Sequence, residues 1–298
     1  MYKIIQKRKI WLSISGTLVI LAIISLFVWG LKFGIDFTGG SLSEIKFSNI
    51  QPTVTEIQDA LQDNGLSSLT VQPMEDNIFV LRFQENSEEK HQALLAKLNE
   101  LAAKNNGTAE ELRFDSIGPS VGKELKSKSF NAIIIVLIII IAYIAFAFRK
   151  ISRPVASWKY GMAAIFALAH DVLITLGVFA ILGRYQGVEI NTTFIAAILT
   201  LLGYSINDTI VVFDRIRENL PKSNEDFEGT VNTSINQTLA RSINTSVTVL
   251  LVLLAILFWG GSSIHDFVLA LSIGVFVGTY SSIFVASPLL VVWEKTKK

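Results

Sequence analysis

The 298-residue sequence contains no cysteine, which excludes disulfide bonds, thiol nucleophiles and cysteine-ligated metal sites. Charged residues are scarce as well: they make up 17% of the chain, against about 25% in a typical soluble domain. No phosphate-binding loop of the Gly-x4-Gly-Lys-Ser/Thr type is present, so work done by this chain does not draw on ATP bound to it. We expect no cofactor, no metal and no nucleic-acid partner.

Long apolar runs are what the sequence has in excess, with hydrophobic residues making up 51% of the chain. A helix of roughly 20 apolar residues crosses the hydrocarbon of a bilayer. The sequence therefore predicts an α-helical membrane protein with six transmembrane helices, at 10–30, 131–148, 159–183, 190–213, 243–260 and 264–292. The first run is too long for a cleaved signal sequence, and we interpret it as an anchor. Gly274 and Gly278 in the last run favour close helix contact.

Lysine and arginine residues gather on one side of this predicted topology, which orients it by the positive-inside rule. Both termini are expected in the cytoplasm, with residues 1–9 as the N-terminal segment, 214–242 as a cytoplasmic loop and 293–298 as the tail. The residues that carry this orientation are Lys3, Lys7, Arg8, Lys9, Arg149, Lys150, Arg153, Lys159, Arg215, Arg217, Lys222, Arg241, Lys295, Lys297 and Lys298.

The segment 31–130, between the first two runs, is expected outside the cytoplasm as one small α+β domain. Its alternating and amphipathic stretches follow the order β-α-β-β-α-β, which predicts a ferredoxin-like head domain with two helices on one face of a sheet. A helix is expected to begin at Thr53, a strained turn is expected at Gly39-Gly40, and His91 is expected at an exposed helix position.

Ionisable residues inside the apolar runs are the candidate functional residues, because each costs about 2.5–3.5 kcal/mol to insert. His170 and Asp171 lie near the middle of the third run, and Asp208 lies inside the fourth. At a rise of 1.5 Å per residue, Asp208 is about 9 Å from the charged end of its helix. Arg241 begins the fifth run from the same side, so an Asp208–Arg241 ion pair is geometrically feasible.

The pair suggests a proton switch, in which protonation of Asp208 leaves Arg241 unpaired at a high cost in free energy and favours another packing of the helices. His170, Asp171, Asn207 and Asp214 are candidates for a supporting role in the relay. Each residue also has a simpler interpretation. Asp208 or the His170-Asp171 pair would then only hydrogen-bond neighbouring helices, Arg241 would be a positive-inside anchor, and Asp214 would belong to the polar rim.

Five motifs resemble the SecD/SecF family of bacterial protein-export membrane proteins, within the resistance-nodulation-division superfamily, over nearly the whole chain. They are "FGIDFTGGS", "IGPSVGKEL", "LAHDVLITLG", "LLGYSINDTIVVFDRIREN" and "NTSINQTLARSINTS". The resemblance implies a subunit in the plasma membrane that joins SecD, the SecYEG channel and YajC, and uses the proton gradient to promote late translocation of a preprotein. It also implies that Asp208 and Arg241 are proton-pathway residues. Membrane lipids are a further expected partner.

Two alternatives use the same residues. A proton-coupled exporter of lipid or small molecules would share the superfamily's physics, although the chain has a single small head domain and six spans. An intramembrane aspartyl protease needs Tyr-Asp and Gly-x-Gly-Asp motifs, whereas Asp171 follows histidine and Asp208 follows asparagine. We therefore expect that the protein is not an enzyme.

Overall fold

The structure is a computed structural model, and it describes residues 1–62, 66, 68–84, 87–147 and 156–295. The chain divides into two compact units: Met1–Lys32 with Asn131–Lys298 form the membrane unit, and Phe33–Phe130 form the head unit. Some residues used for the predicted topology lie outside the described residues, namely 148 at the end of the second run and the basic residues at 149, 150, 153, 297 and 298.

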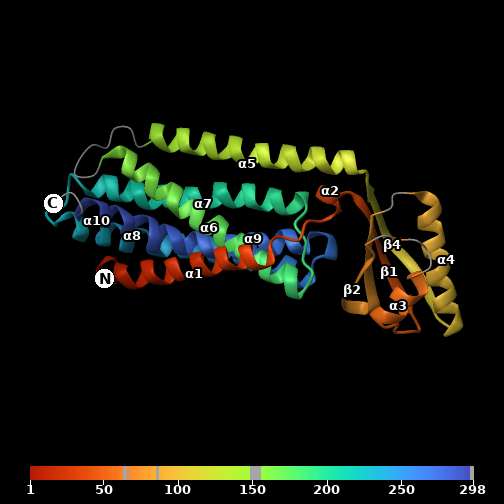
Figure 1. Cartoon of the computed structure of the whole chain (residues 1–298). Coiled ribbons are helices and arrows are strands. Elements are labelled where there is room, and N and C mark those ends of the chain that lie inside the picture. The colour runs from red at the N-terminus through yellow and green to blue at the C-terminus, as the bar shows by residue number, and fades with distance from the viewer. Residues whose placement is uncertain (63–65, 67, 85–86, 148–155, 296–298) are drawn as a thin grey trace. The chain divides into compact units, whose positions relative to one another are not determined.

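Six helices among the described residues are long and apolar enough to cross a membrane, which confirms the predicted class. The last of them is interrupted by a π-helical turn, η4, between α9 and α10. Figure 1 labels these two helices. A short turn, η1 (Ile5–Lys7), precedes the first helix. The elements are α1 (Arg8–Trp29), α5 (Pro119–Ala147), α6 (Ser157–Tyr185), α7 (Thr192–Asn219), α8 (Phe227–Trp259), α9 (Ser262–Ser281), η4 (Ser282–Ala286) and α10 (Ser287–Lys295).

The segment 214–242, expected as a cytoplasmic loop between two spans, is helical over most of its length. Helix α7 continues to Asn219, and α8 begins at Phe227, where the side chain of Asp226 accepts a hydrogen bond from the Gly229 N–H at 2.8 Å. Hydropathy locates the apolar part of a helix, but it does not show where the helix begins when its first turns are polar. The polar first half of α8 stays helical because Val231 on one of its faces is buried in the bundle core.

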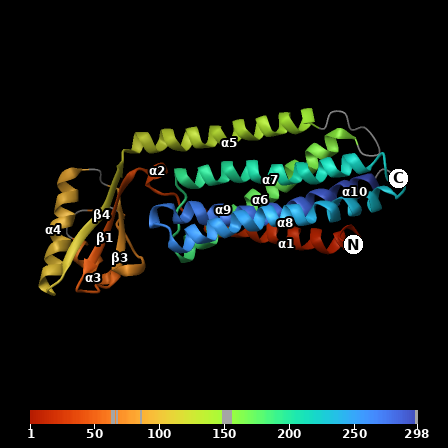
Figure 2. The same cartoon turned by 180° about the vertical axis from the view of Figure 1, so that it is seen from behind.

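Small residues let the helices of the bundle approach each other closely. A Cβ atom added to Gly177 of α6 would lie 2.4 Å from the Cβ of Ala22 on α1, and one added to Gly274 of α9 would lie 2.7 Å from Leu201 on α7. The prediction that Gly274 serves close helix contact is thus confirmed. Figure 2 shows α1, α6, α8 and α9 side by side in the bundle, with the start of α1 and the end of α10 at the same end.

The head unit is a four-stranded antiparallel sheet in the order β2-β3-β1-β4, which is the ferredoxin-like order that the sequence predicts. Helices α3 and α4 pack on one face of this sheet through Ile57, Leu94 and Leu98. The elements are α2 (Ile35–Thr38), β1 (Gly40–Ser48), α3 (Val54–Leu61), β2 (Thr70–Pro73), η3 (Glu75–Asn77), β3 (Ile78–Phe83), α4 (Glu88–Lys104) and β4 (Thr108–Ile117).

The two specific expectations for the head helices had different outcomes. Thr53 caps the N-terminus of α3, as predicted, and it forms a reciprocal capping box with Glu56. The expectation that His91 is exposed was wrong: it is buried, with its Nε2 2.9 Å from Glu111 and its ring stacked on Phe114. The reason is helical spacing, because His91 shares the inward face of α4 with Leu94.

The Gly39-Gly40 turn that leads into β1 requires glycine at both positions. Gly39 has φ +74° and Gly40 has φ +121°, a backbone region that residues with a side chain rarely adopt. Space is lacking as well, since a Cβ atom on Gly40 would lie 2.6 Å from the carbonyl oxygen of Phe83. The expected strained turn is confirmed.

We expect Gly40→Ala to destabilise the head unit by about 1–3 kcal/mol, because the alanine would be strained in φ and would displace β3. Hydrogen exchange followed by mass spectrometry on the full chain should show faster exchange in β1. Gly118→Ala is the matched control, because a Cβ atom there meets nothing within 4 Å. Equal exchange of β1 in both variants would contradict this account of the turn.

Candidate functional site

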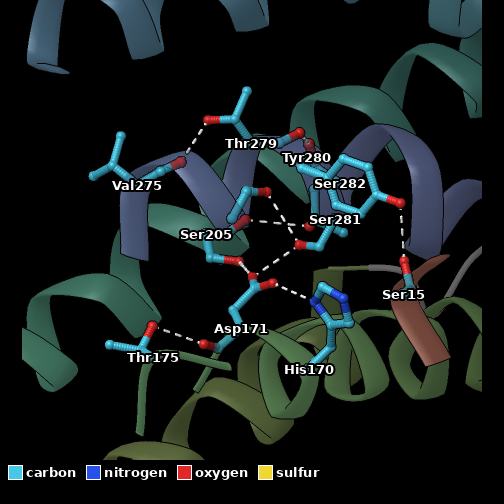
Figure 3. Close-up of polar contacts among 12 residues, drawn as sticks. Ser15, His170, Asp171, Thr175, Ser205, Val275, Thr279, Tyr280, Ser281 and Ser282 are labelled. Carbon is cyan, nitrogen blue, oxygen red and sulfur yellow. Dashed lines mark hydrogen bonds and ion pairs between the residues drawn. The ribbon is translucent and has the colours of Figure 1, made fainter. Parts of the chain in front are cut away.

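The candidate site starts from Asp171 on α6, which is fully buried inside the bundle. Its Oδ2 accepts hydrogen bonds from Ser205 of α7 at 2.5 Å and from Ser281 of α9 at 2.8 Å. Its Oδ1 lies 2.9 Å from Nδ1 of His170, the preceding residue. Figure 3 shows these three partners converging on the carboxyl group from three helices. Within the bundle, the carboxyl group thus finds the donors that water would supply outside.

Asp208 on α7 is the second buried carboxyl group, with 8% of the residue exposed. Its Oδ1 accepts a hydrogen bond from Ser242 of α8 at 2.6 Å, and its Oδ2 accepts one from Ser282 at the start of η4. Ser205 and Asp208 lie three residues apart on one face of α7, so the two carboxyl sites are neighbours along that helix.

Consecutive serines join the two sites. Ser281 is the last residue of α9 and donates to Asp171, whereas Ser282 is the first residue of η4 and donates to Asp208. Successive residues of a regular helix point about 100° apart, so a single helix can serve two carboxyl groups on different sides. Single π-helical turns inside α-helices occur frequently at functional sites.

Each of these serines has a second acceptor within reach. The Ser281 hydroxyl is 3.1 Å from the carbonyl oxygen of Gly278, and the Ser282 hydroxyl is 3.0 Å from that of Thr279. A hydroxyl group has a single proton to donate, so each serine serves either its aspartate or its own helix. If an aspartate binds a proton, its serine can turn to the backbone carbonyl and accept a hydrogen bond from the new O–H group.

His170 extends the site toward α1. Its Nδ1 faces Asp171, while its buried Nε2 has no hydrogen-bond partner among the described residues. The ring stacks against Tyr280 at 6.2 Å, and the Tyr280 hydroxyl accepts a hydrogen bond from Ser15 of α1 at 3.1 Å (Figure 3). An Nδ1–H that donates to Asp171 leaves Nε2 as the nitrogen able to take up a proton.

The predicted Asp208–Arg241 ion pair does not form among the described residues. Arg241 is exposed on α8, while its neighbour Ser242 points inward and occupies the place beside Asp208. Depth along the helix, which made the pair feasible, does not determine which face of α8 a residue occupies.

The remaining predicted residues divide in the same way. His170 and Asp171 belong to the buried site, as described above. Asn207 is exposed on α7, on another face than Asp208. Asp214 forms an ion pair with Arg217 at 2.6 Å, and both side chains are more than two-fifths exposed. Asp214 thus belongs to the polar end of α7 and not to the buried site.

Sequence reasoning missed the serines that hold both aspartates: Ser205, Ser242, Ser281 and Ser282. A usable signal was present, because Ser205 lies one helical turn before Asp208 and the Ser281-Ser282 pair follows Gly278 by one turn. The described residues contain no group of three His, Cys, Asp or Glu side chains that could hold a metal ion.

Comparison with known proteins gives consistent results. A family profile described as "Protein export membrane protein SecD/SecF, C-terminal" matches residues 97–296, and the "SecD/SecF GG Motif" matches residues 24–49, which include Gly39-Gly40. A protein translocase subunit SecF from Thermobaculum terrenum is 44% identical, over 99% of this chain and 94% of its own length. The corresponding subunit from Anaerolinea thermophila is 38% identical over the same shares.

A solved structure is similar as well. The crystal structure of SecDF from Thermus thermophilus, a translocon-associated membrane protein, matches with a TM-score of 0.85 and 36% identity over 99% of this chain. The match covers 39% of that solved chain, so this chain spans about two-fifths of its length.

We expect Ser281→Ala to lower the stability of the bundle by about 1–3 kcal/mol, because it removes a donor from the buried carboxyl group of Asp171. Thermal unfolding of the detergent-solubilised full chain, followed by tryptophan fluorescence, should show a lower midpoint. Ser13→Ala makes the same chemical change at an exposed position of α1 and should leave the midpoint unchanged. A midpoint for Ser281→Ala equal to that of the control would show that the hydroxyl contributes no stability.

Proposed function

The chain belongs to the SecD/SecF family of protein-export membrane proteins, and we propose that it is an accessory subunit of the Sec machinery that, together with SecD, uses the proton gradient to promote late translocation and release of polypeptides. The observation that carries this proposal is the pair of buried carboxyl groups, Asp171 and Asp208, held by adjacent serines of one helix. The names of the relatives favour this function over the export of lipids or small molecules.

The first step is proton uptake by Asp208. In the arrangement described here, neutral hydroxyl groups flank this carboxyl group on both sides. These hydroxyl groups stabilise an ionised Asp208 only in part, so the ionised carboxyl group would also favour a nearby cation, whereas the protonated form would not need one. The protonation state of Asp208 therefore selects between two sets of partners.

Arg241 is the cation best placed to pair with Asp208 when that carboxyl group is ionised. It directly precedes Ser242, so the two side chains leave α8 about 100° apart. A turn of α8 about its axis would exchange the hydroxyl group for the guanidinium group beside Asp208. In this scheme the serine-bound arrangement is one state of the cycle, and an Asp208–Arg241 pair is the other.

The energies involved are comparable. One proton that crosses 100 mV releases about 2.3 kcal/mol. A hydrogen bond to a charged group contributes about 1.5–3 kcal/mol. A proton thus supplies the free energy needed to exchange one or two contacts of the kind that Ser242 and Ser282 make, which suffices to shift a balance between two helix packings.

We further propose that SecD covers the exposed side of α7. Small or polar residues recur on that side at helical spacing, which suits close packing and hydrogen bonding against another transmembrane helix. They are Thr193, Ala196, Thr200, Gly203 and Asn207. The solved SecDF chain, which is longer than this one, is consistent with a separate SecD partner. Assembly with the SecYEG channel and YajC belongs to the same proposal.

The orientation completes the proposal. We propose that the start of α1 and the end of α10 face the cytoplasm of a bacterial cell, because the positive-inside rule favours the side on which the basic residues gather. The head unit then lies on the outer side of the plasma membrane, where an emerging preprotein could be bound. Protons that enter from the outer side would reach Asp171 and Asp208 within the bundle.

Asp208→Asn should reduce the gradient-stimulated part of export by roughly tenfold or more, because an amide does not take up a proton near neutral pH. The measurement is preprotein translocation in inverted vesicles that contain SecD, with and without a proton gradient. Asp214→Asn, at the polar end of the same helix, should export like the wild type. Undiminished stimulation in Asp208→Asn, with normal amounts of subunit in the membrane, would rule out this relay.

Variants of Arg241 test the second partner. Arg241→Lys keeps the charge but loses the planar guanidinium fork, so we expect partial export, whereas Arg241→Met should lose the gradient-stimulated part. Arg217→Met is the control, since Arg217 forms its ion pair with Asp214 at the helix end. Wild-type export in Arg241→Met would remove Arg241 from the scheme while leaving Asp208 in it.

A further inference from the structure

A groove with a volume of about 640 Å³ runs along the membrane unit between the N-terminal segment, α8 and the α9–η4 helix. Its walls are almost entirely apolar and include Trp11, Val247 and Phe284. The groove is open to the side, so the hydrocarbon of the bilayer would have direct access. We infer that this groove binds one anionic phospholipid, with an acyl chain along α8 and the phosphate at Lys3 and Lys7.

The length of the groove fits one leaflet of a bilayer. Its α8 wall extends from Leu239 to Leu250, which corresponds to about 16 Å at a rise of 1.5 Å per residue. Half of a hydrocarbon core of about 30 Å is about 15 Å. An acyl chain that enters at the interface would therefore follow the groove to its far end near the middle of the bilayer.

The charges lie at one end of the groove. The N-terminal segment, with Lys3 and Lys7, sits beside the Leu239 end, because the backbone N–H of Tyr2 donates to Asn236 of α8 at 2.7 Å. The opposite end, near Leu250, is lined by apolar residues. Two cations at the interface and an apolar channel below them match a phospholipid with a negative headgroup, and basic pockets between transmembrane helices bind such headgroups.

The two lysines are available for a ligand. Arg8, beside them, is already paired with Glu228 at 2.7 Å, whereas Lys3 and Lys7 are exposed and form no ion pair in the described part of the chain. Their backbone is held in place, because Asn232 of α8 accepts hydrogen bonds from the Ile4 and Ile5 N–H groups at 3.0 and 3.2 Å. The backbone that carries the two lysines is thus fixed beside α8, and binding has to order only their side chains.

Native mass spectrometry of the full chain in detergent, titrated with phosphatidylglycerol or phosphatidylcholine, tests the inference. The wild type should retain one phosphatidylglycerol in preference to phosphatidylcholine. The double variant Lys3→Gln/Lys7→Gln should lower that preference roughly tenfold. Lys7→Gln and Lys9→Gln form a matched pair, since Lys9 is on the same turn but does not line the groove, and only Lys7→Gln should weaken the preference.

A second pair of variants tests the apolar part of the groove. Val247→Trp should fill it and remove the retained lipid, whereas Val252→Trp, on the bilayer-exposed side of α8, should not. Equal retention of both lipids by the wild type, or equal effects within either matched pair, would overturn the inference. So would a Val247→Trp variant that keeps its lipid but no longer co-purifies with SecD, because the groove would then be a subunit contact. Lipid retention is measured without export, so this inference stands or falls separately from the proposed function.

Discussion

A carboxyl group in the interior of a membrane bundle must find its hydrogen-bond donors in the protein, and this requirement organises the centre of the molecule. Asp171 and Asp208 are both served by serine hydroxyls on neighbouring helices. Serine is short, so donor and acceptor helices must lie close together, and the closeness in turn requires small residues. At Gly278 an added Cβ atom would lie 3.1 Å from Ser205 and 3.5 Å from the Asp171 carboxylate. The glycine is needed for the hydrogen bond as much as for the packing.

Much of this could be predicted from the sequence, because hydrophobic runs and strand-helix alternation depend on composition and period alone. The six spans, the order of the head elements and the two buried aspartates all follow from such patterns. The partners of the aspartates do not. Whether Arg241 or Ser242 faces Asp208 depends on the rotation of α8 about its axis, which is set by its packing against neighbours such as α7 and α9. The burial of His91 in the head unit was not predicted for the same reason, because it depends on which face of α4 packs against the sheet.

The membrane unit has polar contacts both at one end of the bundle and around the two buried aspartates, and the two groups of contacts differ in strength and in their ability to change. At the end of the bundle, Glu228 bridges Arg8 and Lys295, in a setting that is partly exposed and therefore contributes modestly. Within the bundle, every contact of the aspartates involves a neutral or titratable donor. Ions that stay paired fix the helices in place, whereas a group that gains or loses a proton can change its partners. The molecule thus combines a fixed end with an adaptable centre.

The π-helical turn η4 adds one residue to the helix that carries both serines. The extra residue is confined to this turn, and α9 and α10 on either side keep regular α-helical geometry. If the π-helical turn shifted along the helix by one residue, only the residue at the shifted position would rotate about the helix axis, by about 100°. Both ends of the helix would keep their contacts with neighbouring helices. A membrane helix could in this way redirect a single hydroxyl group without sliding or tilting, so that a rearrangement of one peptide unit would change the hydrogen bonding of one aspartate and leave the other undisturbed.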